Sequence, residues 1–568
     1  MLDFIMEAGE TYAKKSLIFF AAFIAYLIIV LGFMHGNNVT RVYFTQQDAP
    51  LGIILILILL LAAYWQPKWH LPAYPPSFRF VLLVAIALTL LTWAGTFWVM
   101  WNYPLTRDEH MAVFDSQIYG TLKLSEPLAL QWRAFSTALT PAFLLAVPDN
   151  LALVSNYMPG SAMMRAAFSK IELAELLNPL LVGVGMLALY RIALRLFSDS
   201  PAAIWLTLGA YVLSAQVLVN AMTTYAMTAH LVLNIIWLGL FLKDRPWSHL
   251  LAILVGLWSI GLHQIIFHPL FAGPFILTLL AQRRFTLFAV YAAVYAGALL
   301  LWISFQGLVL DLAGIQAGWG SAAQSNGFVE NRIVPLLRID RNALVYTMCN
   351  LLRLIMWAPA FAIVACLFAR EPICRNQDIA LPLFGGIALT SIAMIILLPH
   401  QGHGWGYRYL HPVMGNIALL AGLGFRHWLS QDSKADSIVI LLAGVTTLLI
   451  LPAQILMAHQ FVKPHAMLTQ LVSQQDSDFV LLDTMPPSDA IDEVRNRADL
   501  SNRPIVISSK NLQPGQLIEL CERGTITPIS RRSFHAVGLS EDVPVTSPYF
   551  EKQLLTIKGR PCLLPSPD

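Results

Sequence analysis

The chain contains 568 residues, of which 57% are hydrophobic and 12% are charged. A mean hydropathy of +0.63 and repeated long apolar runs exclude an ordinary soluble protein. The formal net charge is only +3 and no block of basic residues interrupts the sequence, so we expect no nucleic-acid partner. These features predict an all-α polytopic membrane protein.

Apolar runs long enough to cross a bilayer recur along most of the chain. Two of them are short and would need a thin bilayer or the inclusion of polar ends. We expect about thirteen transmembrane helices, at residues 16–34, 51–65, 79–101, 173–197, 202–220, 226–242, 249–266, 268–282, 285–306, 343–369, 379–399, 411–427 and 437–458.

Lysine and arginine residues gather in one set of connecting segments, such as those around Lys14 and Arg283. The short segments 221–225 and 263–268, on the other side, contain neither residue type. Because cytoplasmic loops are enriched in positive charge, the first set is expected in the cytoplasm. The other loops and the C-terminal tail then face outward, which for a bacterial inner-membrane protein is the periplasm.

The long loop at residues 102–172 is expected on the outer side and contains two amphipathic stretches. Residues 131–147 and 161–172 mix apolar and polar side chains, a pattern typical of helices that lie in the membrane plane. Between these stretches, Asn156 and Tyr157 begin a turn that ends in Pro-Gly.

Beyond residue 459 the composition changes to that of a small folded domain. The short apolar runs 479–482 and 504–507 are typical of buried strands, and each precedes a helical stretch, around 488–498 and 513–523. This alternation predicts an α/β domain outside the membrane. Cys521 and Cys562 lie in this tail and are expected to be close enough to pair.

An acidic stretch follows the run 79–101 directly, where Arg107, Asp108, Glu109 and His110 occupy consecutive positions. Ionisable groups at a membrane surface are costly unless they are solvated or used, so the stretch is a candidate site. A carboxylate there can accept a proton from a hydroxyl if partial burial raises its pKa toward neutrality. Either carboxylate is a candidate base; the alternative is an ordinary polar end of a membrane span.

A second outward segment, residues 400–411, combines Arg408 with flanking Tyr407 and Tyr409 and with His403. A guanidinium pairs with phosphate oxygens through two hydrogen bonds, and tyrosine can donate another, so the segment suits a phosphate ester. Glycines in the segment allow close backbone approach or simply form a turn. Its histidines suggest a metal only weakly, because histidine spacing alone is not specific.

A third outward loop, residues 307–342, also concentrates polar and charged side chains, including Arg338. The second expected outer loop, residues 220–226, contains no carboxylate. No cofactor other than a divalent metal is considered, and the resemblance described next implies that a metal is possible but not favoured.

Together these features resemble the polyprenyl-phosphate-sugar-dependent glycosyltransferases of the GT-C fold, in particular protein O-mannosyltransferases and lipid A aminoarabinose transferases. In that superfamily one span delivers an acidic residue to the start of a long outer loop with two interfacial helices. The resemblance implies two additional N-terminal transmembrane helices at 1–78, a GT-C-like catalytic domain at 79–459, and a periplasmic α/β domain at 460–568. The core shared with the family would span about residues 79 to 306.

The resemblance also implies roles for the polar residues of the outer loops. Asp108 or Glu109 would be the catalytic base, and a mechanism without metal is favoured because residues 220–226 depart from the metal-using members. The expected donor-phosphate-binding residues are Arg408, Tyr407, Tyr409 and His403, and the expected substrate-binding residues are Arg107, His110, Asn156, Tyr157 and Arg338.

The sequence thus predicts an inverting glycosyltransferase that moves a sugar from a polyprenyl-phosphate donor to a hydroxyl of a periplasmic glycan, lipid or protein. The alternatives are a transporter or flippase of lipid-linked glycans, and an O-antigen-type polymerase or ligase. A transporter is less favoured, because we find no internal repeat and the ionisable groups gather at one face instead of the midplane.

The distribution of lysine and arginine makes a direct prediction about topology. A reporter enzyme that is active only in the periplasm, fused after residue 460, should give a strong signal. A signal only from a cytoplasmic reporter at the same position would invert the orientation, and the assignment of outward loops would be lost with it.

Overall fold

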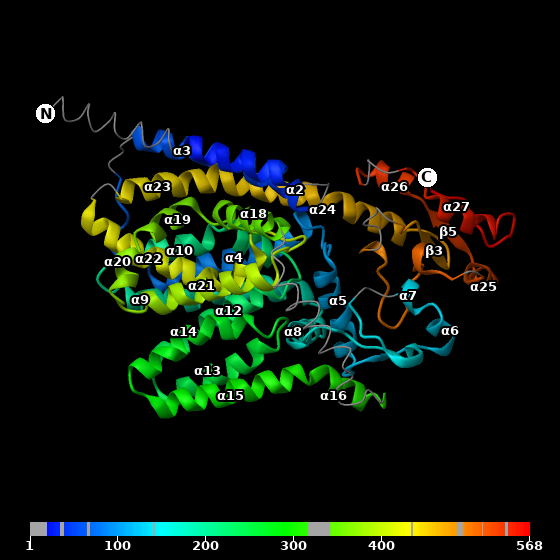
Figure 1. Cartoon of the computed structure of the whole chain (residues 1–568), viewed down its shortest axis with the longest axis horizontal. Coiled ribbons are helices and arrows are strands. Elements are labelled where there is room, and N and C mark those ends of the chain that lie inside the picture. The colour runs from blue at the N-terminus through cyan, green and yellow to red at the C-terminus, as the bar shows by residue number, and fades with distance from the viewer. Residues whose placement is uncertain are drawn as a thin grey trace.

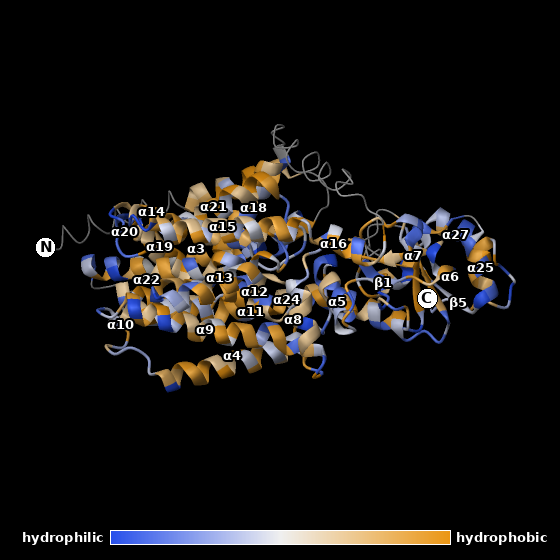
Figure 2. Cartoon of the chain, turned by 90° about the horizontal axis from the view of Figure 1, so that it is seen from below, coloured by the Kyte–Doolittle hydropathy of each residue, from blue (hydrophilic) through white to orange (hydrophobic). Residues whose placement is uncertain are grey.

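The computed structural model describes residues 20–34, 39–64, 69–139, 143–315, 341–432, 435–485, 492–513, 515–539 and 544–567. The described chain is mostly helical, with a large helical body at one end and a smaller mixed lobe at the other (Figure 1). A band of hydrophobic helices forms the body, and the lobe and its loops are markedly more hydrophilic (Figure 2).

The body begins with a helix at Phe20–Phe33. Its further helices are α2 (Val39–Tyr43), η1 (Phe44–Asp48), α3 (Ala49–Tyr64), α4 (Phe78–Trp98), α9 (Leu177–Leu196), α10 (Pro201–Val212), α11 (Ala215–Ala221), α12 (Met227–Lys243), α13 (Pro246–Ile260), α14 (Phe267–Ala281), α15 (Phe285–Ile303), α16 (Phe305–Leu312), α18 (Arg341–Trp357), α19 (Ala360–Leu367), α20 (Arg370–Cys374), α21 (Ala380–Leu397), η6 (Arg408–Val413), α22 (Met414–Gln431), α23 (Ala435–Val445), η7 (Thr446–Ile450) and α24 (Leu451–Ser473).

Each of the thirteen expected apolar segments overlaps one of these helices. Within the described residues, however, only 5 helices are long and apolar enough to cross a membrane, or up to 7 if each of two bent pairs is one span. Several of the others, such as α13 and α14 with 15 residues each, are shorter than a bilayer requires. The total of thirteen spans therefore stays a prediction.

The two bent pairs have local causes in the sequence. Helices α10 and α11 meet at 46°, where the hydroxyl of Ser214 accepts a hydrogen bond from the backbone of Val217 and starts a new helix. Helices α18 and α19 meet at 109°, at Pro359. Proline has no backbone N–H to donate and disfavours a helical conformation at the preceding residue, so a straight helix cannot pass through it.

The first large loop folds into short elements: α5 (Arg107–Gly120), β1 (Glu126–Pro127), α6 (Leu130–Arg133), α7 (Ser136–Leu139), η2 (Pro148–Asn150), β2 (Ala152–Leu153), α8 (Gly160–Ser169) and η3 (Ala174–Leu176). The expected helix at 161–172 matches α8 over most of its length. The expectation of one interfacial helix at 131–147 was wrong, because α6 and α7 are single turns. Phe135 and Leu139, two apolar residues of that stretch, are buried in a core shared with the C-terminal lobe.

The C-terminal lobe contains a parallel sheet of β3 (Phe479–Leu482), β4 (Ile505–Ser508) and β5 (Ile526–Ile529), in the order β4-β3-β5. Helices α25 (Gln516–Arg523), α26 (Arg531–Ala536) and α27 (Pro548–Leu555) and the turn η9 (Ser509–Asn511) complete it. Both expected strands and the second expected helix are present, and β5 was missed. The expected helix at 488–498 is absent from its described part, 492–498. The position of the lobe in the periplasm stays a prediction.

One hydrophobic core joins the lobe to the first large loop. It contains Phe114 and Leu139 from the loop and Phe479 and Ile505 from the sheet. The side chain of Asn496 reinforces the junction by donating a hydrogen bond of 2.7 Å to the carbonyl of Leu139. Helix α5 is therefore supported by the lobe on one side and by the membrane body on the other.

The expected pairing of Cys521 with Cys562 is confirmed, with Cα atoms 5.3 Å apart. The bond closes a loop of 41 residues around β5. We expect replacement of both cysteines by serine to reduce the free energy of unfolding of the lobe by about 2–4 kcal/mol. Limited proteolysis in increasing urea would measure this change, and Cys374→Ser, at an exposed free cysteine, is the control. Equal effects of both variants would contradict a stabilising role of the disulfide.

Candidate functional site

The start of α5 is set by a capping box between Thr106 and Glu109. The Thr106 hydroxyl accepts a hydrogen bond of 3.2 Å from the backbone of Glu109, and the Glu109 carboxylate accepts one of 2.9 Å from the backbone of Thr106. These bonds satisfy helix N–H groups that have no partner within the helix. Glu109 thereby points back along the chain, and Asp108, one residue earlier, points to a different side.

Asp108 meets Arg408, which is 300 residues further along the chain. The Nη1 atom of Arg408 lies 2.6 Å from the Oδ2 atom of Asp108, and both side chains are largely buried. The hydroxyl of Tyr157 donates a hydrogen bond to the other carboxylate oxygen of Asp108. The acidic stretch, the turn of the first large loop and the segment 400–411 thus converge on one carboxylate.

Two more tyrosines surround the guanidinium of Arg408. Its Nη1 donates to the hydroxyl of Tyr225 at 3.1 Å, and its Nη2 donates to the hydroxyl of Tyr409 at 3.2 Å. The guanidinium also lies over both rings, with its carbon 5.3 Å from the centroid of Tyr225 and 5.0 Å from that of Tyr409. Such contacts stabilise a cation that is largely removed from water.

The segment before η6 needs its glycines for space and for backbone conformation. Gly402 and Gly406 have φ values of +64° and +67°, which favour glycine. A Cβ atom at Gly406 would lie 2.4 Å from the amide oxygen of Gln216. That amide accepts from the backbone N–H of Tyr407 at 3.1 Å and donates to its carbonyl at 2.9 Å, which holds the segment against α11.

The N-terminal helices also support this segment. Asp48, at the end of η1, lies 3.6 Å from the guanidinium of Arg353 in α18, and both side chains are buried. Arg353 in turn donates a hydrogen bond of 2.8 Å to the carbonyl of Gly404 and stacks on Tyr43. The first helices are therefore part of the framework of the site.

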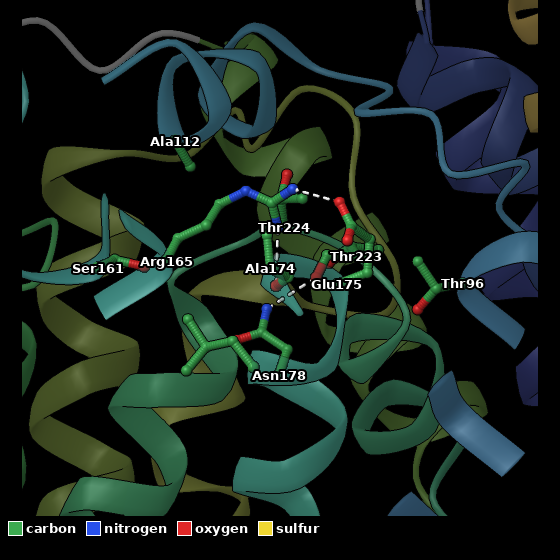
Figure 3. Close-up of a pocket in the computed structure, with 10 residues that line it drawn as sticks. Thr96, Ala112, Ser161, Arg165, Ala174, Glu175, Asn178, Thr223 and Thr224 are labelled. Carbon is green, nitrogen blue, oxygen red and sulfur yellow. Dashed lines mark hydrogen bonds and ion pairs between the residues drawn. The ribbon is translucent and has the colours of Figure 1, made fainter. Parts of the chain in front are cut away.

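The side chain of Asn178 holds the loop 223–226 and thereby fixes the position of Tyr225. The amide of Asn178 donates to the carbonyls of Thr223 and Tyr225 at 2.7 and 2.9 Å. Figure 3 shows Asn178 and the ion pair of Arg165 with Glu175 around a cavity of about 10 Å³. That volume suits one water molecule, so we interpret this place as structural.

Charge and burial act in opposite directions on the two adjacent carboxyl groups. Burial raises the pKa of Asp108, but the guanidinium of Arg408 and the imidazole of His263 outweigh it and lower that pKa below its usual value. Burial raises the pKa of Glu109 to about 7, because the hydrogen bonds within the capping box compensate only in part. In this conformation Asp108 is the ionised member of the pair.

Asp115 supports the turn that delivers Tyr157. The hydroxyl of Ser155 donates a hydrogen bond of 2.6 Å to Asp115 and accepts one of 3.1 Å from the backbone N–H of Tyr157. The ring of Tyr157 also stacks on His263, with centroids 4.8 Å apart. Asp115 is only 1% exposed, and burial raises its pKa to about 7.

The other expected site residues lie at varying positions. Arg107 forms an ion pair with Asp492 of the lobe, and Asn156 is exposed beside the core of the site. His110 lies on a different side of α5 and lines a cavity with Arg495. Arg338 lies outside the described residues.

Among the residues expected to bind the donor phosphate, Arg408 and Tyr409 contact each other directly. The hydroxyl of Tyr407 is buried and has no partner within the described chain. The ring of His403 lies near Tyr43, whereas its carbonyl accepts a hydrogen bond from Tyr225 at 3.2 Å.

Three contributors were not among the expected site residues: Tyr225, Gln216 and His263. Tyr225 lies in a loop that we noted only because it lacks lysine, arginine and carboxylates. His263 lies in a tight turn that could equally hold an interfacial aromatic. Gln216 sits in an apolar helix, where an amide is uncommon because its burial without partners is costly. A polar side chain in such a run is the one signal that could have identified it.

Within the described residues, no group of three or more His, Cys, Asp or Glu side chains is placed to hold a metal ion. The expectation of a mechanism without metal therefore stays a prediction.

No protein-family model matches the sequence, and no curated protein matches it. Two crystal structures of ArnT from Cupriavidus metallidurans are similar to this chain. The one bound to undecaprenyl phosphate has 13% identity and a TM-score of 0.45, over 76% of this chain and 86% of that chain. The one in the apo state has 12% identity and a TM-score of 0.46, over 75% and 85%.

The buried carboxyl group of Asp115 predicts a pH-dependent stability. Its folded-state pKa of about 7 lies above the usual value near 3.9, so its stabilising contribution is complete at low pH and is lost as pH rises toward 7. Asp115→Asn keeps the hydrogen bond to Ser155 but cannot ionise. We expect its free energy of unfolding, relative to that of wild type, to rise by on the order of 1–3 kcal/mol between pH 5 and pH 8.

Unfolding of both proteins in detergent at the two pH values would measure this difference. If the difference in the free energy of unfolding stays constant across this pH range, the pKa of Asp115 is not raised in the folded protein.

Proposed function

We propose that this chain is a membrane glycosyltransferase that moves a sugar from a polyprenyl-phosphate donor to an acceptor hydroxyl. The observation that carries the proposal is the contact of 2.6 Å between Asp108 and Arg408. A base and the leaving phosphate must flank one anomeric carbon, so the two side chains that serve them must lie at one site. Two segments separated by 300 residues meet in this way.

Arg408 has the surroundings of a phosphate ligand. Its guanidinium is 7% exposed and lies between the hydroxyls of Tyr225 and Tyr409, which could both donate to phosphate oxygens. A donor phosphate would compete with Asp108 for the same guanidinium edge. In a site with little water, the leaving phosphate would be stabilised as its negative charge develops.

This competition would also prepare the base. While Arg408 pairs with Asp108, the pKa of the carboxyl group is held low and it is a poor proton acceptor. When the donor phosphate takes the guanidinium, the effect of burial remains and raises the pKa of Asp108. The carboxylate then becomes a stronger base only when the donor is bound.

The chemical step follows from these positions. The acceptor hydroxyl transfers its proton to Asp108 as its oxygen forms a bond with the anomeric carbon. The bond between that carbon and the phosphate oxygen breaks, and its electron pair leaves with the polyprenyl phosphate beside Arg408. Attack opposite to the leaving group inverts the anomeric configuration. Glu109 would hold the start of α5 and would not itself react.

The proposal includes the location of the protein. The positive loops would face the cytoplasm of a bacterium, and the site and the C-terminal lobe would face the periplasm. The lipid tail of the donor would lie among the helices of the body. The acceptor would be a glycan, lipid or protein that carries a free hydroxyl, and neither a metal nor an organic cofactor is required by the step.

The experiment that tests this proposal compares cell-envelope glycans and lipids, by mass spectrometry, from cells with and without the gene. We expect one product with an additional sugar only where the gene is present, and more sugar-bearing polyprenyl phosphate where it is absent. Identical glycans and lipids in both strains would overturn the transferase, and redistribution of a lipid across the membrane without new bonds would favour a transporter.

Substitutions at the ion pair make the proposal specific. Asp108→Asn keeps the shape of the side chain and removes the base, so transfer should fall by about 10²- to 10⁴-fold in a folded protein. Arg408→Ala should mainly weaken binding of the donor, by a few kcal/mol of binding free energy at most. The matched control is Asp199→Asn, which breaks the exposed pair with Arg426 and should leave transfer unchanged. Full activity of Asp108→Asn would exclude that carboxylate as the base.

A further inference from the structure

A second cavity, of about 350 Å³, lies where the body, helix α5 and the C-terminal lobe meet. Its volume is within the range of small-molecule sites. The side chains that matter for its chemistry are Trp101, Asn102, His110, Gln470, Ser473 and Arg495. Neither Asp108 nor Arg408 lines this cavity, so it is separate from the ion-pair site.

The cavity wall is close to neutral although it includes an arginine. Arg495 donates hydrogen bonds to the carbonyl of Pro104 and to the hydroxyl of Tyr103, at 2.7 and 2.8 Å, and stacks on the ring of Tyr103. The same Tyr103 donates a hydrogen bond of 2.6 Å to the buried carboxylate of Glu493. Since this carboxylate offsets the guanidinium, the wall offers little net charge to an anion such as a phosphate.

His110 adds a neutral group with unused hydrogen-bonding capacity. Its Nε2 atom is buried and has no partner within the described part of the chain. Burial and the nearby guanidinium of Arg495 lower the pKa of His110 to about 3, so the ring is uncharged at neutral pH. A neutral imidazole offers one donor and one acceptor, which matches a hydroxyl group.

The backbone at the rim is unusual. Trp101 and Asn102 have φ values of +56° and +48°, the left-handed region that a bulky side chain rarely adopts. These residues end helix α4, where the backbone of Asn102 donates to the carbonyl of Thr96 at 2.7 Å. The end of a helix commonly has one residue in the left-handed region, usually glycine. It does not explain why a tryptophan adopts this conformation. Trp101 remains 39% exposed at the rim of the cavity.

From these observations we infer that the cavity binds an uncharged sugar unit. An exposed indole can cover the apolar face of a sugar ring, and Asn102, Gln470 and Ser473 can exchange hydrogen bonds with its hydroxyls. The neutral wall favours such a ligand over a phosphate or an acidic group. This inference rests in part on the proposed function, since it makes the acceptor a carbohydrate.

The position of the cavity adds a requirement on acceptor length. His110 follows Asp108 by two positions, about 200° around a helix, so the two side chains lie on opposite sides of the first turn of α5. A helix with its side chains is about 10 Å across. One sugar unit could not occupy both places, so the acceptor is an oligosaccharide with one unit in the cavity and another at Asp108.

The test is direct binding to the purified full-length protein in detergent, without any requirement for transfer. The probes are neutral trisaccharides (maltotriose, cellotriose, mannotriose and chitotriose), followed by saturation-transfer NMR. We expect at least one to bind to wild type, and binding to fall at least tenfold in Trp101→Ala and in Gln470→Ala.

Trp247→Ala is the matched control. It removes another partly exposed indole, from the first turn of α13, which does not line the cavity, and should not affect binding. If no trisaccharide binds, or if the Trp101 and Gln470 variants bind as wild type does, the sugar site is overturned. If binding follows these expectations but the gene produces no new glycan, the sugar site stands and only the transferase fails. If a polyprenyl phosphate displaces the trisaccharide from wild type, the cavity holds a lipid phosphate and the inference is wrong.

Discussion

The contact between Asp108 and Arg408 is the constraint on which the rest of this protein depends. Two buried charges of opposite sign tolerate each other in a poorly solvated place, but either one alone would be costly. The capping box at Thr106, the amide of Gln216 and the pair of Asp48 with Arg353 all serve to keep those two charges together. Elements from η1 to η6 are therefore organised around one ion pair, and any ligand that opens it must supply a replacement for the lost partner.

The C-terminal lobe is part of this arrangement, although it contributes no residue to the ion pair. It buries one side of α5 and of the loop that follows, so the orientation of Asp108 depends on a sheet that begins some 370 residues later in the chain. The lobe also completes the second cavity through Arg495. In the proposed enzyme, recognition of an acceptor and positioning of the base would thus share one interface.

Helical segments and the acidic and basic motifs could be predicted from the sequence, because apolar runs and unusual charges at their ends are local signals. The proximity of Arg408 to Asp108 could be inferred only from the demands of a mechanism. Where the apolar side chains of residues 131–147 are buried could not be predicted, because an apolar face suits a membrane surface and a protein core equally well. In the structure they pack against the sheet of the lobe. Tyr225 and Gln216 were missed because their roles arise from contacts across 183 and 191 residues. The polar side chain of Gln216 in an apolar helix was the only local signal for either residue.

Helices α23 and α24, joined by the π-helical turn η7, form one helix of 39 residues from Ala435 to Ser473 that runs from the body into the lobe (Figure 1). At 1.5 Å per residue it forms a strut about 58 Å long. The strut sets the rotation of the lobe relative to the body as well as their distance. A single inserted residue would turn the lobe by about 100° about the helix axis. The partners at the two ends of this strut therefore fix the number of residues between them.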